Sequence, residues 1–502
     1  MSALLVVLLA APLLGCIALV AVPATVGDRI ARLVGLVVSG VVLLVSVAVA
    51  ATFDYGSPGT MQFQVDAAWA AAFDLRFHLG VDGVSLPLVV LTALLVFLCL
   101  VYSIRHVPRP GRPRAFVALI LLLEVGMLGT FVALDLVLFF VVFEIVLVPM
   151  YFLIAVWGGE GRQPAGTKFI LYTVLGSVVM LLGFLVIYAQ TGTFDMIELA
   201  DRGGEGIARG IQIAAFLAIG IGFAVKTPLW PLHTWLPDAH TAAPTVGSVL
   251  LAGVLLKMGT YGFVRIALPV LPDGARAIAP ALGVLAVIGI VYGSLACLAQ
   301  HDLKRLIAYS SVGHMGFVVL GIATLTAPGI NGALFANVAH GLITGLLFFL
   351  AGAVKDRHGT ADMSDLGRGL YARVPRLAAL LAFAAVASLG LPGLAGFWGE
   401  MLAMLGAFRP DASLDRPLFL VLMVVAGLGT VLTAAYLLQM VRRVNQGISD
   451  ERWTQPRMVD VTGTEWSAWT PLVIATIVVG LCPWLLLDIT DPAVQVIVGG
   501  AG

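Results

Sequence analysis

Long apolar runs recur along the chain and are separated by short polar connections. A helix needs about 20 apolar residues to cross a bilayer, and each of these runs is close to that length or longer. There are fourteen such runs, at 3–22, 30–51, 84–104, 115–134, 136–157, 167–190, 210–227, 243–264, 277–299, 303–323, 330–353, 376–407, 417–441 and 468–489. The pattern predicts an all-α polytopic membrane protein with about 14 transmembrane helices.

Composition agrees with this prediction. The 502 residues are 60% hydrophobic and only 11% charged, and the mean hydropathy is +1.04. A soluble protein of this length needs far more charge to cover its surface. The 28 basic and 28 acidic residues cancel, so no excess of positive charge points to a nucleic-acid partner.

The distribution of basic residues predicts the orientation in the membrane. Nineteen Lys and Arg residues lie in the odd-numbered connections and seven in the even-numbered ones, while Lys226 and Lys257 lie inside apolar runs. Connections rich in Lys and Arg stay in the cytoplasm. The odd-numbered connections are therefore expected to be cytoplasmic, and both termini are expected on the outer side.

Two of the apolar runs contain residues that break a helix. In "VKTPLWPLHTWLPDAHT" (225–241), Pro228 and Pro231 cannot donate to the carbonyls of Ala224 and Thr227, and in "LGLPGLAGFWGE" Pro392 has the same effect. The breaks lie five runs apart, which predicts two inverted five-helix repeats, each with one broken helix. The alternative is that each proline only kinks a packed helix. The predicted units are 1–114, 115–276 (first repeat), 277–443 (second repeat) and 444–502.

Ionisable side chains occupy the interior of several apolar runs. The charged ones are Glu124, Glu144, Lys226, Lys257 and Glu400. Four histidines accompany them: His314 and His340 in the tenth and eleventh runs, and His233 and His240 after the first break. Such groups are costly in a membrane and are functional by default. A purely structural role remains the alternative, above all for the histidines, which are common as hydrogen-bonded packing residues.

This set of residues suits the movement of protons. Burial disfavours the charged forms of both lysine and carboxylate, so both can change protonation near neutral pH. Carbonyls freed at the breaks can hold waters that connect them. No nucleophilic triad or phosphate-binding loop is present. Each of the four cysteines stands alone in an apolar run, which gives no spacing for a metal or iron–sulfur site.

Three segments carry a family resemblance. The stretch "VKTPLWPLHTWLPDAHTAAPTVGSVLLAGVLLKMGTYGFVR", together with "HDLKRLIAYSSVGHMGFV" and "HGLITGLLFFLAGAV", resembles the antiporter-like subunits of respiratory complex I and the related multisubunit cation/proton antiporters. Glu400 stands where the related antiporter subunits are expected to carry lysine. That difference favours a complex I subunit within the superfamily.

The resemblance implies a role for each of these residues. Glu144 would pair with Lys226, and Lys257 would be the central relay lysine, with His314 and His340 beside it. Glu400 would be the terminal carboxylate near the outward exit. A further carboxylate, Glu124, would line a subunit boundary.

The resemblance also implies partners and cofactors. The chain would be a proton-translocating subunit of NADH:quinone oxidoreductase in a bacterial inner or plasma membrane, flanked on both sides by other antiporter-like subunits. It would contact lipid, protons and water and bind no cofactor or metal itself. NADH, FMN, iron–sulfur clusters and quinone would belong to partner subunits. Two alternatives stay open: a subunit of a sodium/proton antiporter or membrane-bound hydrogenase, and a structural subunit without its own proton path.

Overall fold

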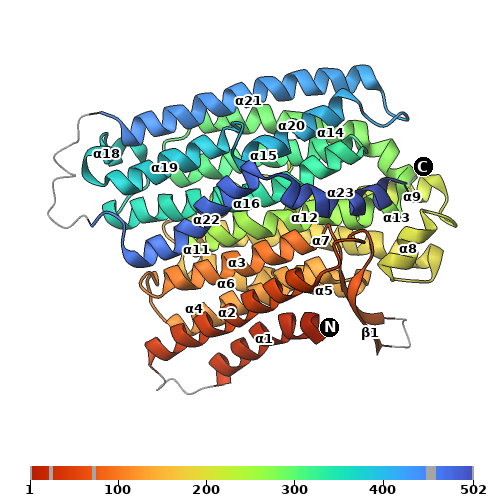
Figure 1. The fold of residues 1–502 in the computed structure, drawn as a ribbon, viewed down its shortest axis with the longest axis horizontal. Coiled ribbons are helices and arrows are strands. Elements are labelled where there is room, and N and C mark those ends of the chain that lie inside the picture. The colour runs from red at the N-terminus through yellow and green to blue at the C-terminus, as the bar shows by residue number, and fades with distance from the viewer. Residues whose placement is uncertain (1–2, 22–26, 71–74, 448–458, 500–502) are drawn as a thin grey trace.

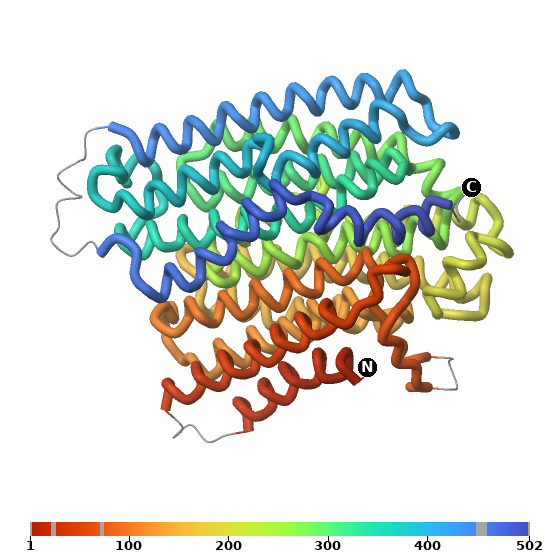
Figure 2. The backbone as a smooth tube through the Cα atoms, in the orientation of Figure 1, coloured from red at the N-terminus to blue at the C-terminus, as the bar shows by residue number. Residues whose placement is uncertain are grey.

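The computed structural model describes residues 3–21, 27–70, 75–447 and 459–499. Its helices run side by side across the molecule and form one elongated bundle (Figures 1 and 2). Within these residues, thirteen helical segments are long and apolar enough to cross a membrane. Two shorter apolar helices account for the twelfth predicted run. The predicted all-α polytopic class is confirmed.

Nine crossings are single helices, because their apolar runs carry no interruption strong enough to break them. They are α1 (Ala3–Ala21), α2 (Asp28–Thr52), α3 (Leu86–Ser103), α4 (Pro113–Val132), α7 (Arg162–Thr191), α14 (Pro272–Leu298), α15 (Leu303–Ala323), α16 (Ala327–His358) and α21 (Arg416–Asn445). The most enclosed of them is α16, which lies in the middle of the bundle, whereas α1 and α21 lie at opposite edges (Figure 1).

The other crossings are interrupted. They are α5 (Leu136–Ile145) with α6 (Leu147–Trp157), α9 (Arg209–Lys226) followed by α10 (Trp235–Ala242), and α19 (Pro375–Ser388) with α20 (Ala395–Phe408). The eighth crossing comprises α11 (Thr245–Leu250), the π-helical segment η2 (Leu251–Leu255), α12 (Leu256–Gly262), a second π-helical segment η3 (Phe263–Ala267) and α13 (Leu268–Val270). Both breaks predicted from proline are therefore present. The inverted relation of the repeats, and their boundaries, stay predictions.

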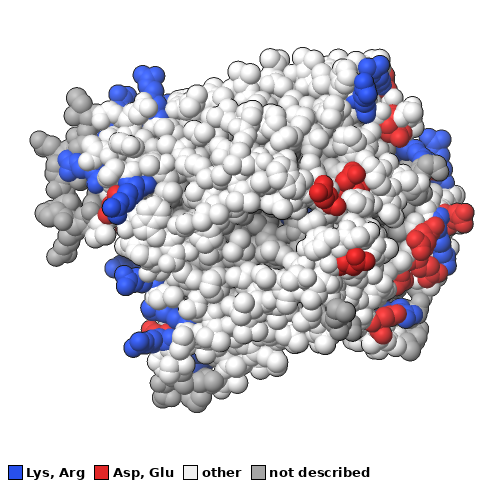
Figure 3. Space-filling model, viewed as in Figure 1, with Lys and Arg blue, Asp and Glu red and all other residues white. Residues whose placement is uncertain are grey.

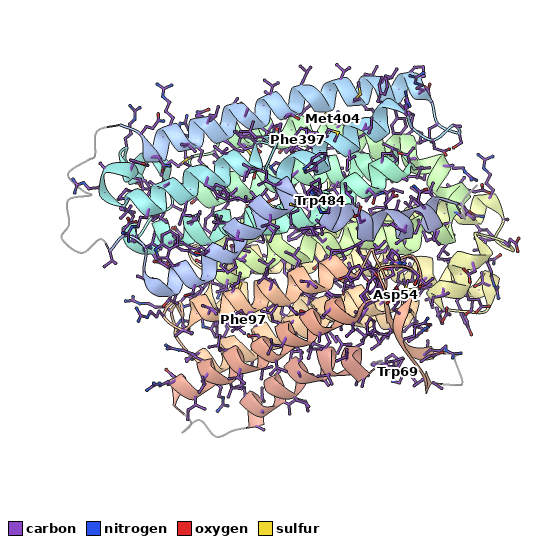
Figure 4. All side chains as sticks on the ribbon, in the orientation of Figure 1. Asp54, Trp69, Phe97, Phe397, Met404 and Trp484 are labelled. Atoms are coloured by element: carbon purple, nitrogen blue, oxygen red, sulfur yellow. The ribbon has the colours of Figure 1, made fainter. Side chains whose placement is uncertain are left out.

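The last crossing differs from its prediction. A continuous helix was expected over 468–489, but α22 (Gly463–Leu481) ends and α23 (Trp484–Gly499) begins inside that range. Pro483 follows Cys482 at the junction and cannot donate a backbone hydrogen bond, so the helix stops there. Trp484, at the start of α23, lies near the middle of the bundle's length (Figure 4). The broken crossing packs against α16.

Short elements fill the connections, and one of them is a β-hairpin that the sequence analysis did not predict. Strands β1 (Gln62–Ala70) and β2 (Leu75–Val81) pair antiparallel. The Arg76 guanidinium bonds the Asp66 carboxyl across the hairpin and holds the pKa of that carboxyl below its ordinary value. The remaining short helices are α8 (Met196–Arg202), α17 (Met363–Leu366) and α18 (Leu370–Arg373).

Charge is divided between the two ends of the bundle. On the face shown in Figure 3, the charged residues at one end are almost all Lys and Arg, whereas the other end carries most of the Asp and Glu together with further Lys and Arg, and a broad, mostly uncharged band lies between them. The start of α1 and the end of α23 both point toward the acidic end (Figure 1). This separation is the one expected of a membrane protein whose basic connections share one side.

Candidate functional site

The centre of the bundle holds a direct contact between two ionisable side chains from different crossings. Lys257, on α12, donates a hydrogen bond from Nζ to Nδ1 of His340 on α16, at 2.7 Å. Its ammonium also bonds the Ala252 carbonyl in the π-helical segment η2. Lys257 is fully enclosed, and His340 is only 6% exposed. The lysine is therefore held by protein groups away from any surface of the chain.

A second contact forms at the break between α19 and α20. His314, on α15, bonds Oε1 of Glu400 through Nδ1 at 3.1 Å, and its Nε2 bonds the Ser388 hydroxyl at 2.9 Å. Ser388 is the last residue of α19, and Glu400 lies on the second turn of α20. A Cβ on Gly390 would approach Glu400 Oε2 to 3.1 Å, so a glycine at this break lets the backbone come close to the carboxylate. The break thus positions both partners of the histidine.

A small cavity joins the two contacts. Its volume is about 30 Å³, and the His314 and His340 ring centroids are 5.8 Å apart. Its walls are His314, Phe317, Ala336, Ala339, His340, Ile343, Thr344, Ser388, Gly396 and Glu400. Nε2 of His340 is buried and has no hydrogen-bond partner among the described residues. A water needs about 10–15 Å³ and polar partners, so the cavity has room for at least one water beside the His340 ring.

Glu144 and Lys226 lie near each other but do not touch. No ion pair joins them in the described part of the chain, yet each carries a through-space charge interaction with the other. The Lys226 ammonium lies 4.7 Å from the ring centroid of Phe143. Glu144 also interacts with Ser177 on α7. The direct pair implied by the resemblance is therefore not formed among the described residues, and the lysine contacts an aromatic ring in place of the carboxylate.

The first break does not leave its carbonyls as free as we expected. Pro228 cannot bond the Ala224 carbonyl, but Leu229 N donates to it at 2.9 Å because the chain turns tightly after Lys226. The Val225 carbonyl accepts from the Trp235 indole at 2.9 Å. The Ala224 carbonyl thus accepts a hydrogen bond within the protein, and a water-holding role for the carbonyls at this break stays a prediction.

Three predicted residues lie away from these contacts. Glu124 was expected at a subunit boundary, but it is fully enclosed within this chain, and neither carboxylate oxygen has a partner among the described residues. The reason is that other helices of the same chain, among them α1, pack against α4. His240 stacks on Phe348 with centroids 4.4 Å apart, and His233 lies edge-on to Tyr292 at 5.0 Å.

Some site features were missed by the sequence analysis. The π-helical segments on either side of Lys257 leave no sequence signature, although such segments are frequent at functional sites. Ser388 could not be distinguished from other polar helix residues. The interruption after Ile145, one residue beyond Glu144, had a usable signal: Pro149 cannot bond the Ile145 carbonyl four residues earlier.

The fold and the site together define a class of protein: a multi-pass helical membrane protein with buried lysine, histidine and glutamate linked across its core. Residues 133–433 match the family model described as "NADH:quinone oxidoreductase/Mrp antiporter, TM". NADH-quinone oxidoreductase subunit M of Rhodobacter capsulatus is 43% identical over 479 residues, which are 93% of this chain and 90% of that protein. The chain therefore belongs to the NADH:quinone oxidoreductase/Mrp antiporter family of transmembrane proteins.

Other relatives and solved structures support the same family assignment. NAD(P)H-quinone oxidoreductase chain 4 1 of Synechococcus sp. (strain JA-3-3Ab) is 42% identical, over 87% of this chain and 82% of that one. A chain of respiratory complex I from Thermus thermophilus superposes with a TM-score of 0.87 at 31% identity, covering 99% of this chain and 100% of that chain. A chain of the Mrp complex from Dietzia sp. DQ12-45-1b has a TM-score of 0.84, but at 22% identity it shows the fold alone. The resemblance drawn from the three sequence segments is confirmed.

Proposed function

We propose that the chain is a proton-translocating membrane subunit of a complex I-type NADH:quinone oxidoreductase in a bacterial inner or plasma membrane, with both termini on the outer side. The names of the relatives support the assignment to NADH:quinone oxidoreductase, and membership of the family supports a role in proton translocation. The observation that carries the proposal is the line Lys257–His340–cavity–His314–Glu400. Apolar side chains surround this line.

The contact between Lys257 and His340 has a defined direction. An ammonium group has only donors, so Nδ1 of His340 must accept and the ring proton must lie on Nε2. A proton that moves from Lys257 to Nδ1 makes the imidazole cationic, and Nε2 then releases its proton into the cavity. One water there can pass the charge to the His314–Glu400 pair. His340 is thus the connector between the lysine and the carboxylate.

Glu144 and Lys226 control when a proton moves toward Lys257. The carboxylate favours the ammonium form of Lys226, because opposite charges attract even without contact. Moving or neutralising Glu144 removes that attraction and favours passage of a proton toward Lys257. Within the described residues, no hydrogen-bond chain joins the two lysines, so the coupling between them is electrostatic or runs through water. His233, His240 and Glu124 hold secondary positions.

Energy for the movement comes from other subunits in this proposal. Quinone reduction in the partners would drive the charge changes, and NADH, FMN, iron–sulfur clusters and quinone would all be bound there. This chain would bind no cofactor and would contact antiporter-like neighbours on both sides. Among the described residues, no group of three or more His, Cys, Asp or Glu side chains is placed to hold a metal ion.

Purification of the affinity-tagged chain from its native membrane tests the enzyme assignment. We expect flavin-containing polypeptides that oxidise NADH to copurify with it. Partners that lack flavin and catalyse sodium/proton exchange would contradict the proposal and favour the antiporter alternative.

Membrane vesicles test the proton path. Lys257→Met should abolish acidification driven by NADH, because methionine keeps the side-chain length and cannot carry a proton. The matched control is Lys168→Met, which removes a partly exposed lysine that pairs with Asp238 at 2.8 Å outside the line. Normal acidification in the Lys257→Met vesicles would favour the structural-subunit alternative.

A further inference from the structure

One face of α21 is left uncovered by the residues that the structure describes. Its exposed positions recur every three or four residues, as expected for one side of a helix. They are Val421, Val424, Leu428, Val431, Ala435, Leu438 and Arg442. The five large aliphatic side chains among them are each 55–66% exposed. These seven residues form what we call the α21 stripe, and α21 itself lies along the outer edge of the bundle (Figure 1).

The α21 stripe ends in a basic pocket. A cavity of about 710 Å³ opens at the C-terminal end of the helix, and its walls are Arg368, Ala435, Leu438, Gln439, Arg442, Arg443, Gln446 and Gly447. Ala435, Leu438 and Arg442 belong to both features, so the stripe and the pocket are continuous. None of the three arginines forms an ion pair with any residue that the structure describes.

The arginines of the pocket are held in place by their neighbours. In the amide orientation that satisfies both groups, Gln439 accepts hydrogen bonds from Arg443 Nη2 at 2.5 Å and Nε at 3.2 Å. Arg368 comes from the segment between α17 and α18, far from α21 in the sequence. Its side chain lies against Gly447, where a Cβ would approach the Arg368 Cβ to 2.8 Å, and Gly447 has a φ of +112°. A glycine is required there for this approach.

The chemistry of the pocket fits a phosphate diester. Guanidinium groups bind phosphate oxygens in bidentate fashion, and three arginines that form no ion pair with a described residue surround one cavity and present an excess of donors to an anion. Basic pockets beside transmembrane helices on the cytoplasmic side are suited to anionic lipid headgroups. On the face shown in Figure 3, the bundle end at which α21 finishes is the basic end.

The α21 stripe fits acyl chains better than a second helix. Interfaces between membrane helices are enriched in small residues that let backbones approach. On α21 the small residues Ala426, Gly429 and Thr433 are buried inside this chain, whereas the stripe consists almost entirely of bulky aliphatic side chains. From Val421 to Leu438 the stripe is about 25 Å long, close to the full thickness of the hydrocarbon core, so the acyl chains of one lipid at the basic end would cover about half of it.

We propose that the pocket and the α21 stripe together form a binding site for one anionic phospholipid, with the phosphate on Arg368, Arg442 and Arg443 and the acyl chains along the half of the stripe nearest the pocket. The site goes beyond the proposed function. It depends on the membrane placement of the chain and not on proton translocation, so its failure would leave the proton path untouched.

Lipid retention by the intact complex tests this site. The complex is reconstituted in phosphatidylcholine nanodiscs that contain a small fraction of phosphatidylglycerol, and bound phosphatidylglycerol is counted by mass spectrometry. The test variant carries Arg368→Gln, Arg442→Gln and Arg443→Gln. Each arginine is worth about a fivefold change in affinity, so the dissociation constant of one lipid should rise about a hundredfold. The same three positions changed to lysine should give an intermediate loss, because charge remains but the bidentate contact is lost.

The control removes equal charge elsewhere. Arg29→Gln, Arg105→Gln and Arg109→Gln replace three exposed arginines in other connections and should leave retention within about twofold of the unmodified complex. Equal retention in the test and unmodified complexes would overturn the proposal, as would equal loss in test and control. Displacement of phosphatidylglycerol by inorganic phosphate alone would show a free-anion site. A cross-link from the pocket arginines to a carboxylate of a neighbouring subunit would show a protein partner, and either result overturns the lipid assignment.

Discussion

Filling the small cavity between the two histidines tests the proposed path without removing any ionisable group. The change is Ala339→Val. Ala339 is buried on α16 and lines the cavity, whose volume of about 30 Å³ is two to three times the roughly 10–15 Å³ that one water needs. The two added methyl groups should exclude that water. Nε2 of His340 would then face only carbon and lose the partner through which it passes its proton.

The size of the effect follows from the burial of His340. An unsatisfied buried polar group costs about 1–3 kcal/mol. If this cost falls on the state in which the proton leaves Nε2, the rate of translocation drops by about fivefold to 150-fold. Overpacking should separately destabilise the fold by about 1–3 kcal/mol. The two effects can be distinguished because only the first requires the cavity.

The assay is NADH-driven acidification of the lumen of proteoliposomes that contain the whole complex, with the rate of NADH oxidation measured in parallel. Ala351→Val is the control: Ala351 is also buried on α16 but does not line the cavity. We expect translocation to fall in Ala339→Val and to persist in Ala351→Val. Unchanged translocation in Ala339→Val, with the extra methyl groups seen in the cavity by cryo-electron microscopy, would refute the role of a water between the histidines.

Two further changes probe other parts of the account. Glu144→Ala should reduce translocation at least about tenfold by removing the charge that favours the ammonium form of Lys226, while NADH oxidation by the peripheral subunits with an artificial acceptor continues; a variant that pumps normally would remove Glu144 from the path. Asp82→Asn should destabilise the chain by about 3–5 kcal/mol, since it leaves the buried Arg265 without its carboxylate. Thermal unfolding of the complex measures this change, and Asp82→Leu combined with Arg265→Met should recover much of the loss. An unchanged melting temperature in the single variant would show that the pair contributes little.

The crossings were largely predictable because lipid imposes a simple rule on sequence. Every backbone group in the membrane must be satisfied within the protein, so long apolar runs become helices, and prolines interrupt them. Lys226 and Ser388 end their helices near Pro228 and Pro392 for this reason. The same rule applied to Pro483 predicts the break in the last crossing, although the apolar run 468–489 alone predicts one continuous helix.

The connections were less predictable. Segment 52–83 contains alternating apolar and polar residues, as in "QFQVD", which is typical of a strand, but five residues are too few to predict a hairpin without its partner strand. The hairpin instead gains support from tertiary contacts: His78 Nδ1 bonds the Asp195 carboxylate at 2.7 Å, 117 residues away. Contacts of this kind have no local signature.

The members of the site could be named from the sequence, but not their pairing. Charge in an apolar run marks Lys257 and Glu400 without ambiguity. Which partner each one meets depends on how the helices rotate against each other. His340 lies 83 residues from Lys257 and is its direct partner, whereas His314 contacts Glu400. The π-helical segments on either side of Lys257 also change the direction in which its side chain leaves the helix, and no residue pattern predicts these segments.

The central claim is that Lys257 gives up its proton to His340 during each cycle. Lys257→Arg tests it most directly, because arginine keeps the positive charge but is not deprotonated in proteins. The measurement is the rate of NADH-driven proton uptake by proteoliposomes containing the variant complex. The account predicts that Lys257→Arg blocks translocation nearly as completely as Lys257→Met. Translocation by the arginine variant at the unmodified rate would mean that Lys257 supplies only a fixed charge, and would contradict the relay.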